Sequence, residues 1–265
     1  MRRAKARTGP AEDKSGNELS AAGQLPRTGE TYNDFNQLTA LTTGGATSRY
    51  TYAGTDSSNR LTAGSTRIDQ GPAGISTTTA DGKSTGFVPD PAGTLTGMTS
   101  GGTPYYYVTD NQGAPSVLVD NSGAKQGRWD YSRTGNARAG NDSLVDQPFG
   151  YTGACLDTTG LYKMGARYYD PTLGRFTQPD PSGKETNAYL YATGNPVNAI
   201  DPTGTSTLGC TAGGVSIVGG VLSVAGGIAG AVGSGGLGTP ASVAAIGGGI
   251  GLVGTGLGFI DACTS

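Results

Sequence analysis

Two aspartates in matching turns are the residues of this sequence best suited to chemistry. Asp180 begins the motif DPSG and Asp201 begins DPTG, and 17 residues, 184–200, separate the two motifs. Pro in the second position and Gly in the fourth favour a tight turn, which would hold each carboxylate on a rigid loop. Two carboxylates that lie close together can share one proton, so that one acts as a base on water and the other as an acid on a carbonyl.

The composition excludes most other catalytic sites. The chain has 265 residues, no histidine, three cysteines and a net charge of -2. Without histidine there is no Ser-His-Asp triad, no Cys-His pair and no zinc site that contains histidine. No CxxC motif occurs, so we expect neither a metal nor a cofactor. A charged fraction of 14% without a basic stripe argues against a nucleic-acid partner.

The elements that must position the aspartates are expected to be strands and turns. Glycine makes up 48 of the 265 residues, more than twice its average usage of about 7%. A Tyr or Phe, a small polar turn and a Leu followed by Thr recur in residues 32–41, 50–64 and 87–101. Single hairpins of this kind bury too little surface to be stable. We therefore expect stacked hairpins in one spiralling β-sheet.

The two ends of the chain differ from this middle part. Residues 1–30 are charged at first and contain no apolar run long enough for a secretory signal peptide, which indicates a cytoplasmic protein before any export. We interpret residues 1–30 as mostly disordered. From residue 202 to residue 260 there is no charged side chain, so a different kind of segment begins near residue 205.

The tail contains two apolar stretches of 20 residues, 213–232 and 241–260, each long enough to cross a bilayer as a helix. GxxxG spacing lets two helix backbones pack closely in lipid. The glycines with this spacing are Gly226, Gly230, Gly247, Gly251, Gly254 and Gly258. The sequence favours a membrane-inserting helical hairpin, although a glycine-rich peptide held inside the β-sheet structure stays open. Cys210 and Cys263 flank the hairpin and could form a disulfide or remain two free thiols.

A long run of motifs resembles one family. GLYKMGARYYDPTLGRF, QPDP and NAYLYATGNPVNAIDPTG follow one another up to residue 204, and YYYVTDNQGAPSVLVDNSG and PFGYTGACLDTTGLY precede them. In this order they resemble the C-terminal core domain of Rhs, or YD-repeat, proteins over about residues 105–204. The resemblance implies a mainly β fold with four parts. These are a disordered region (1–30), degenerate YD repeats (31–104), the core domain (105–204) and a variable tail (205–265).

The resemblance also implies a role for the aspartates. In Rhs proteins such a pair is assigned to an aspartyl-protease-like site that cuts the chain itself, here after Gly204 or Thr205, with Arg175 as the partner that keeps a carboxylate ionised. The spacer is one residue shorter than in cleaving members, and Thr205 stands where those members usually carry Leu. Asp90 begins another such turn, DPAG, so a purely structural role for both aspartates stays open.

Three hypotheses of function follow. In the first, the Rhs core presents and releases a membrane-active tail in bacterial antagonism, with the lipid membrane and a cognate immunity protein as partners and no enzymatic toxin domain. In the second, the chain is a membrane-anchored or surface remnant without activity. In the third, aromatic residues form a carbohydrate-binding surface, against the alternative that they pack between strands. These aromatics are Tyr105, Tyr106, Tyr107, Trp129, Tyr131, Tyr168 and Tyr169. The expected location is membrane-associated or exported.

Overall fold

The computed structural model describes residues 11–21, 26–205 and 208–209. The chain divides into two compact units, one of residues 1–197 and 201–206, the other of residues 198–200 and 207–265. In the described residues of the first unit the regular elements are β-strands and two short 3-10 helices, η1 (Tyr151–Gly153) and η2 (Ala192–Gly194). The expectation of a mainly β fold is confirmed for this part of the chain.

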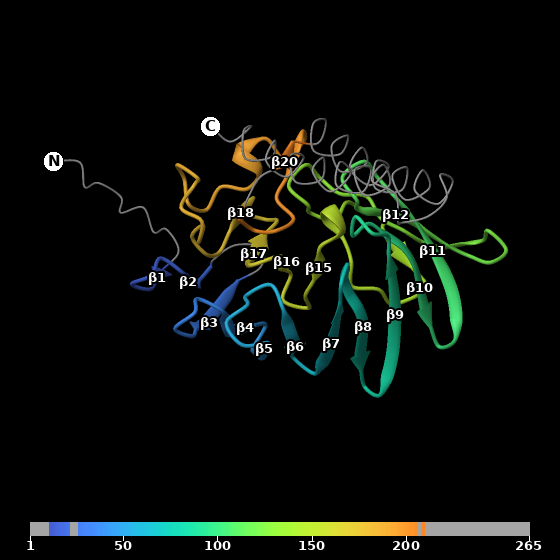
Figure 1. Ribbon diagram of the computed structural model, residues 1–265, viewed down its shortest axis with the longest axis horizontal. Helices are drawn as coiled ribbons and strands as arrows, with labels where there is room; N and C mark the ends of the chain where they lie inside the picture. The colour runs from blue at the N-terminus through green and yellow to red at the C-terminus, as the bar shows by residue number, and fades with distance from the viewer. Residues whose placement is uncertain (1–10, 22–25, 206–207, 210–265) are drawn as a thin grey trace, which may run out of the picture. The chain divides into compact units, whose positions relative to one another are not determined.

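Most strands belong to one antiparallel sheet of 12 strands, in which each strand pairs with its neighbours in chain order, from β3 to β14 (Figure 1). Its strands are β3 (Arg27–Tyr32), β4 (Leu38–Thr43), β5 (Ala46–Tyr52), β6 (Arg60–Ala63), β7 (Thr66–Gly71), β8 (Gly74–Ala80), β9 (Lys83–Pro89), β10 (Leu95–Ser100), β11 (Thr103–Thr109), β12 (Pro115–Asp120), β13 (Lys125–Arg128) and β14 (Asp142–Ser143). The sequence repeats therefore correspond to consecutive hairpins of one sheet.

Aspartates build several of the hairpin turns in the same way. Asp90 accepts backbone hydrogen bonds from Ala92 (2.9 Å) and Thr94 (2.8 Å) on one carboxylate oxygen. Gly93 follows with φ +87°, which a residue without a Cβ adopts readily. Asp110 and Asp120 bind the amides two and four residues later in the same pattern. These turns show what an Asp-x-x-Gly motif does in this fold without any catalytic role.

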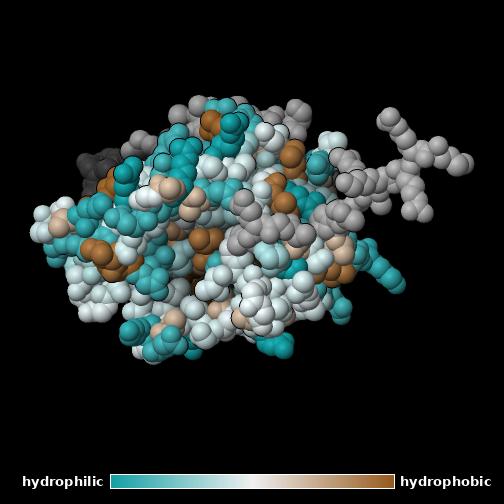
Figure 2. Space-filling view, turned by 180° about the vertical axis from the view of Figure 1, so that it is seen from behind, coloured by the Kyte–Doolittle hydropathy of each residue, from teal (hydrophilic) through white to brown (hydrophobic). Residues whose placement is uncertain are grey.

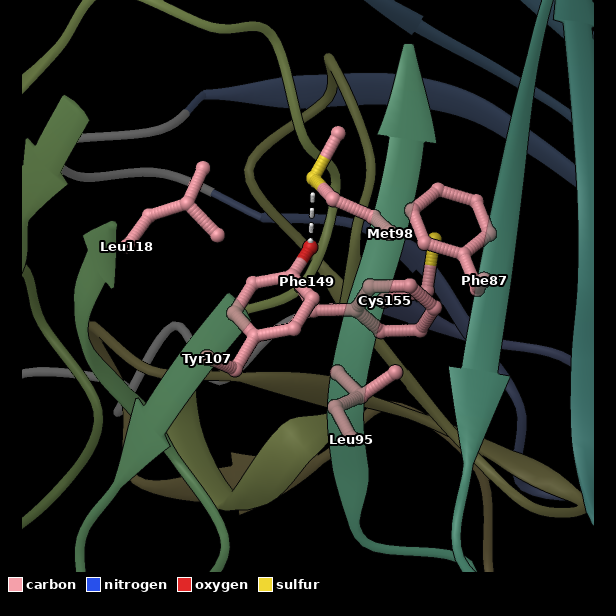
Figure 3. Close-up of a cluster of buried hydrophobic side chains, with 7 residues drawn as sticks. All are labelled: Phe87, Leu95, Met98, Tyr107, Leu118, Phe149 and Cys155. Carbon is pink, nitrogen blue, oxygen red and sulfur yellow. Dashed lines mark hydrogen bonds between the residues drawn. The ribbon is translucent and has the colours of Figure 1, made fainter. Parts of the chain in front are cut away.

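One face of the sheet carries a buried apolar cluster (Figure 3). Strands β9 to β12 contribute Phe87, Leu95, Met98, Tyr107 and Leu118. Phe149 and Cys155, from the segment that follows the sheet, close the cluster, and the Tyr107 hydroxyl donates to the Met98 sulfur at 3.0 Å. The core segment thus packs on the repeats instead of forming a separate domain.

A second antiparallel sheet contains β15 (Cys155–Leu156), β16 (Tyr162–Met164), β17 (Arg167–Asp170) and β18 (Arg175–Phe176). All four residues of β17 are buried. Tyr168 of this strand packs with Leu38, Leu41 and Tyr50 of the large sheet, so both sheets share a core. The boundary that we expected between residues 104 and 105 falls inside β11, because the large sheet continues through it.

The interpretation of residues 1–30 as disordered is wrong for the described part of that segment. Residues 11–12 (β1, Ala11–Glu12) pair with β2 (Glu18–Ser20), and β3 begins at Arg27. The cause is a buried ion cluster: Arg27 donates to Glu18, to Glu30 (3.0 Å) and to Asp170 (2.7 Å), and its side chain is fully buried. Burial raises the pKa of Glu30 to about 7, against the opposing charge of Arg27. Charged residues therefore fasten this segment to β17.

In the second unit the described strands are β19 (Ala199–Ile200) and β20 (Leu208–Gly209), which pair antiparallel. The expected helical hairpin, its glycines, Cys210 and Cys263 lie outside the described residues. Among the residues that are described, no helix is long and apolar enough to span a membrane. On the face of the molecule that Figure 2 shows, apolar side chains form separate spots among hydrophilic and neutral ones.

Candidate functional site

The second aspartate turn, residues 201–204, lies against the turn that joins β16 to β17. The Ala166 amide donates to the carbonyl oxygen of Thr203 at 2.8 Å. The approach is close enough that a side chain on Gly204 would collide with the carbonyl oxygen of Met164 and lie 2.9 Å from the Arg167 nitrogen. A side chain on Gly165 would collide with Thr203. Glycine on both sides therefore lets the backbone of residues 203–205 lie directly on the small sheet.

Arg167, the first residue of β17, holds this segment. Its Nε donates to the Gly204 carbonyl oxygen at 2.5 Å, one Nη donates to Asp201 at 3.1 Å and the other to the Ala188 carbonyl at 3.0 Å. The guanidinium lies over the Phe176 ring, 3.5 Å from its centre, and only 1% of the residue is exposed. Burial lowers the pKa of Arg167, while the charges of Asp201 and Asp180 oppose this lowering. The arginine is thus fixed on Asp201, and the charge of Asp180 also acts on it.

The Asp201 carboxylate accepts a hydrogen bond from the backbone nitrogen of Thr205. One of its carboxylate oxygens accepts from the Thr205 amide at 3.2 Å and from the Thr203 hydroxyl at 3.2 Å, and the other accepts from Arg167. The residue is 2% exposed. The Gly204–Thr205 peptide is therefore held at its oxygen by a cation and at its nitrogen by a carboxylate.

Asp180 belongs to the first turn and reaches the same segment through Ser182. Its carboxylate accepts from the Ser182 hydroxyl at 2.6 Å and from the Ser182 amide at 3.0 Å. The Ser182 hydroxyl also lies 3.1 Å from the carbonyl oxygen of Thr205. Burial alone raises the pKa of Asp180, but hydrogen bonds from Ser182 and the charge of Arg167 outweigh it, so the pKa lies below its usual range. Asp180 is therefore a carboxylate at neutral pH.

These groups could hydrolyse one of the two peptide bonds of Thr205. A buried guanidinium on a carbonyl oxygen is placed to stabilise negative charge that develops there. An ionised carboxylate can take a proton from water, and a group on the peptide nitrogen can return a proton to the leaving amine. The same turns also resemble those of Asp90 and Asp110, whose carboxylates only order the backbone. Burial and the shared arginine distinguish Asp180 and Asp201 from them.

The sequence led us to Arg175 as the ionic partner of Asp180, and the structure corrects this. Arg175 of β18 binds Glu18 at 2.8 Å and lies over the Tyr189 ring. In the strand register Arg175 pairs with Asp170, whereas Phe176 pairs with Tyr169. Because neighbouring side chains of a strand point to opposite faces, Arg175 faces the Arg27 cluster, and Arg167 shares the face of Phe176. Arg167 is the arginine that binds Asp201.

Most of the aromatic residues singled out in the sequence pack inside the fold. Tyr107, Tyr168 and Tyr169 are buried, and Tyr105 and Trp129 pack against the apolar cluster of Figure 3. Tyr106 is half exposed. Neither Ser182 nor the cation role of Arg167 was predicted from the sequence, although an arginine inside the buried strand RYYD needs a charged partner. That requirement was the available signal for Arg167.

Comparisons with known proteins agree with the fold. Residues 78–197 match the family described as Teneurin YD-shell. The chain is 34% identical over 137 residues to the tRNA3(Ser)-specific nuclease WapA of Bacillus spizizenii. The aligned residues make up 48% of this chain and 6% of the nuclease. It is 34% identical over 106 residues to the toxin subunit YenC1 of Yersinia entomophaga, which covers 37% of this chain and 11% of the subunit. Over these residues the chain is similar to Rhs/YD-repeat proteins.

Solved structures show the same YD-repeat fold. The structure of TcdB2-TccC3 superposes with a TM-score of 0.56 at 19% identity, over 73% of this chain and 11% of that one. The Photorhabdus luminescens Tc holotoxin pore gives a TM-score of 0.55 at 20% identity, with 73% and 10% covered. The chain thus spans about a tenth or less of the length of these relatives.

Proposed function

We propose that this protein cuts its own chain at Thr205 and so releases a membrane-active C-terminal tail in antagonism between bacteria. The observation that carries the proposal is the pair of hydrogen bonds to the Gly204–Thr205 peptide. Its oxygen accepts from Arg167, and its nitrogen donates to Asp201. Two relatives that are named as toxins support the setting: the toxin subunit, and a double-stranded DNA deaminase toxin of Burkholderia cenocepacia that is 36% identical over 107 residues.

The proposed reaction is hydrolysis of a peptide bond on one side of Thr205. Water adds to the carbonyl carbon, a C–O bond forms and the C–N bond breaks. Asp180, which is ionised, takes one proton from the water, and the carboxylate pair returns one proton to the leaving nitrogen. When Gly204 supplies the carbonyl, Arg167 balances the charge on its oxygen. Atoms and protons balance without a metal or cofactor.

Asparagine at either aspartate should abolish this cut. Asn keeps the oxygen that orders the turn but neither takes nor returns a proton, so we expect Asp180→Asn and Asp201→Asn to slow self-cutting by about 100-fold or more. The full chain, tagged at both ends, is refolded from denaturant and sampled over time on a denaturing gel. Asp90→Asn, in the DPAG turn, is the matched control and should cut at the wild-type rate. Equal cutting in all four chains would refute the site.

The tail supplies the second half of the proposal. Residues 202–260 carry no charge, and two stretches of 20 apolar residues are separated by the glycine-rich segment 233–240. Such stretches are long enough to cross the hydrocarbon core as a helical hairpin, and small residues at GxxxG spacing allow the helices to pack. The tail sequence contains no Ser-Lys pair, Cys-His pair or acidic cluster on which an enzymatic toxin could depend.

Charge in the middle of either stretch should prevent membrane damage. An aspartate near the centre of a spanning helix costs about 2.5–3.5 kcal/mol on insertion, so Leu222→Asp and Ile250→Asp should each suppress dye release from phospholipid vesicles by the cut protein. Thr239→Asp, in the segment between the stretches, should release dye like the wild type. If the wild type releases no dye, the tail is not membrane-active by this measure.

A membrane anchor without toxicity is the second candidate, and the same apolar stretches favour it. It predicts an uncut chain that remains in the membrane fraction without harm to the cell. A cognate immunity protein is a partner only under the first function.

A further inference from the structure

Ser182 contacts both aspartate turns of the candidate site. Its hydroxyl lies 2.6 Å from a carboxylate oxygen of Asp180 and 3.1 Å from the carbonyl oxygen of Thr205. These residues come from different turns, because Asp180 belongs to the first aspartate turn and Thr205 follows the second. The hydroxyl therefore connects the ionised carboxylate to the peptide segment that it would cut.

We propose that Ser182 is a positioning residue for self-cutting, which orients the Asp180 carboxylate and holds the Thr205 carbonyl beside it. This role rests on the proposed function and adds a residue to it. Serine at the third position of an Asp-x-x-Gly turn is not required for the turn itself, since the turn that begins at Asp90 has Ala92 there and Gly93 after it.

A second turn in the same chain shows what such a serine does away from the site. Asp120 and Ser122 stand in the motif DNSG, as Asp180 and Ser182 stand in DPSG. The Ser122 hydroxyl lies 2.6 Å from the Asp120 carboxylate, the same distance as in the candidate site. Both serines are exposed, and Ser182 in addition lies within hydrogen-bond distance of the Thr205 carbonyl. The chain therefore contains its own control for the local effect of the serine.

The hydroxyl also affects the protonation of the carboxylate. A hydrogen bond to the charged form of a carboxylate lowers its pKa, and among the interactions that lower the pKa of Asp180 the Ser182 hydroxyl is the largest. Loss of the hydroxyl should therefore raise the pKa of Asp180. Since cutting needs the ionised form, its rate should then begin to fall at a higher pH as the solution is acidified.

Ser182→Ala in the full chain tests this role. We expect self-cutting to slow by about tenfold or more, as when a group that supports an acid or base is lost, and the acid limb of the rate against pH to move upward. Ser182→Thr, which keeps the hydroxyl, should retain both the wild-type rate of cutting and the wild-type pH of the acid limb. Ser122→Ala should change neither, which separates the effect from the local stability of a turn.

The outcomes separate this role from the proposed function. Wild-type rate and pH dependence in Ser182→Ala, together with loss of cutting in Asp201→Asn, would overturn only the role of Ser182. A wild-type chain that stays intact would overturn the proposed function and the role with it. Slow cutting in Ser182→Ala with an unshifted acid limb would show that the hydroxyl does not act through Asp180.

Discussion

Replacement of Arg27 by methionine should lower the free energy of unfolding by about 3–5 kcal/mol, because removal of one partner of a buried ion pair leaves an uncompensated charge. Arg27 is fully buried and binds three carboxylates, Glu18, Glu30 and Asp170. Methionine fills a similar volume but satisfies none of them. We expect urea unfolding of Arg27→Met to begin at a much lower concentration than in the wild type.

The control is a solvent-exposed arginine that also pairs with an aspartate. Arg67 binds Asp69 at 3.0 Å, and its side chain is 73% exposed. Exposed ion pairs contribute little, so Arg67→Met should change the free energy of unfolding by about 0.5 kcal/mol or less. If the two variants unfold at the same urea concentration, the Arg27 cluster does not hold β2 and β3 to β17.

Alanine at position 204 should stop self-cutting. The new Cβ would collide with the Met164 carbonyl oxygen and lie 2.9 Å from the Arg167 nitrogen, and φ of +66° is itself unfavourable for alanine. Since backbone atoms cannot move aside cheaply, residues 203–205 must leave their position on β17. The carbonyl oxygen of residue 204 then loses its hydrogen bond from Arg167. We expect the rate of cutting to fall about 100-fold or more, measured on a gel after refolding.

Gly183, at the same place in the first turn, is the matched control. Its φ is +65°, and a Cβ there would have no atom within 4 Å. Gly183→Ala therefore carries the conformational strain without the collision and should still cut. A common rate for the two alanine variants would mean that the close approach of residues 203–205 to β17 is not needed for cutting.

The repeats made much of the fold predictable. The segment 87–101 that we identified as a repeat unit contains the end of β9, a turn that begins at Asp90, and β10. Its Tyr or Phe and Leu positions could be assigned to a buried face because alternation along a strand is local information. Phe87 and Leu95 do lie in the core. Sequence motifs alone also indicated the family that the chain resembles.

Contacts between distant segments could not be predicted. Arg27 and Asp170 are 143 positions apart, and nothing in the composition of the first 30 residues shows that their charges are neutralised from β17. The choice between Arg167 and Arg175 likewise depends on the register of β17 with β18, because a shift of one residue exchanges the faces of a strand. Ser182 acquires its second contact only when the two aspartate turns meet.

We propose that the two aspartates and Arg167 hydrolyse the chain beside Thr205. Intact-mass measurement of the refolded full chain tests it most directly. We predict two fragments whose masses add up to that of the chain plus one water, with the new end at Gly204 or Thr205, and a single uncut mass for Asp201→Asn. A wild-type chain that keeps its full mass, or a cut at another position that persists in Asp201→Asn, would contradict the account.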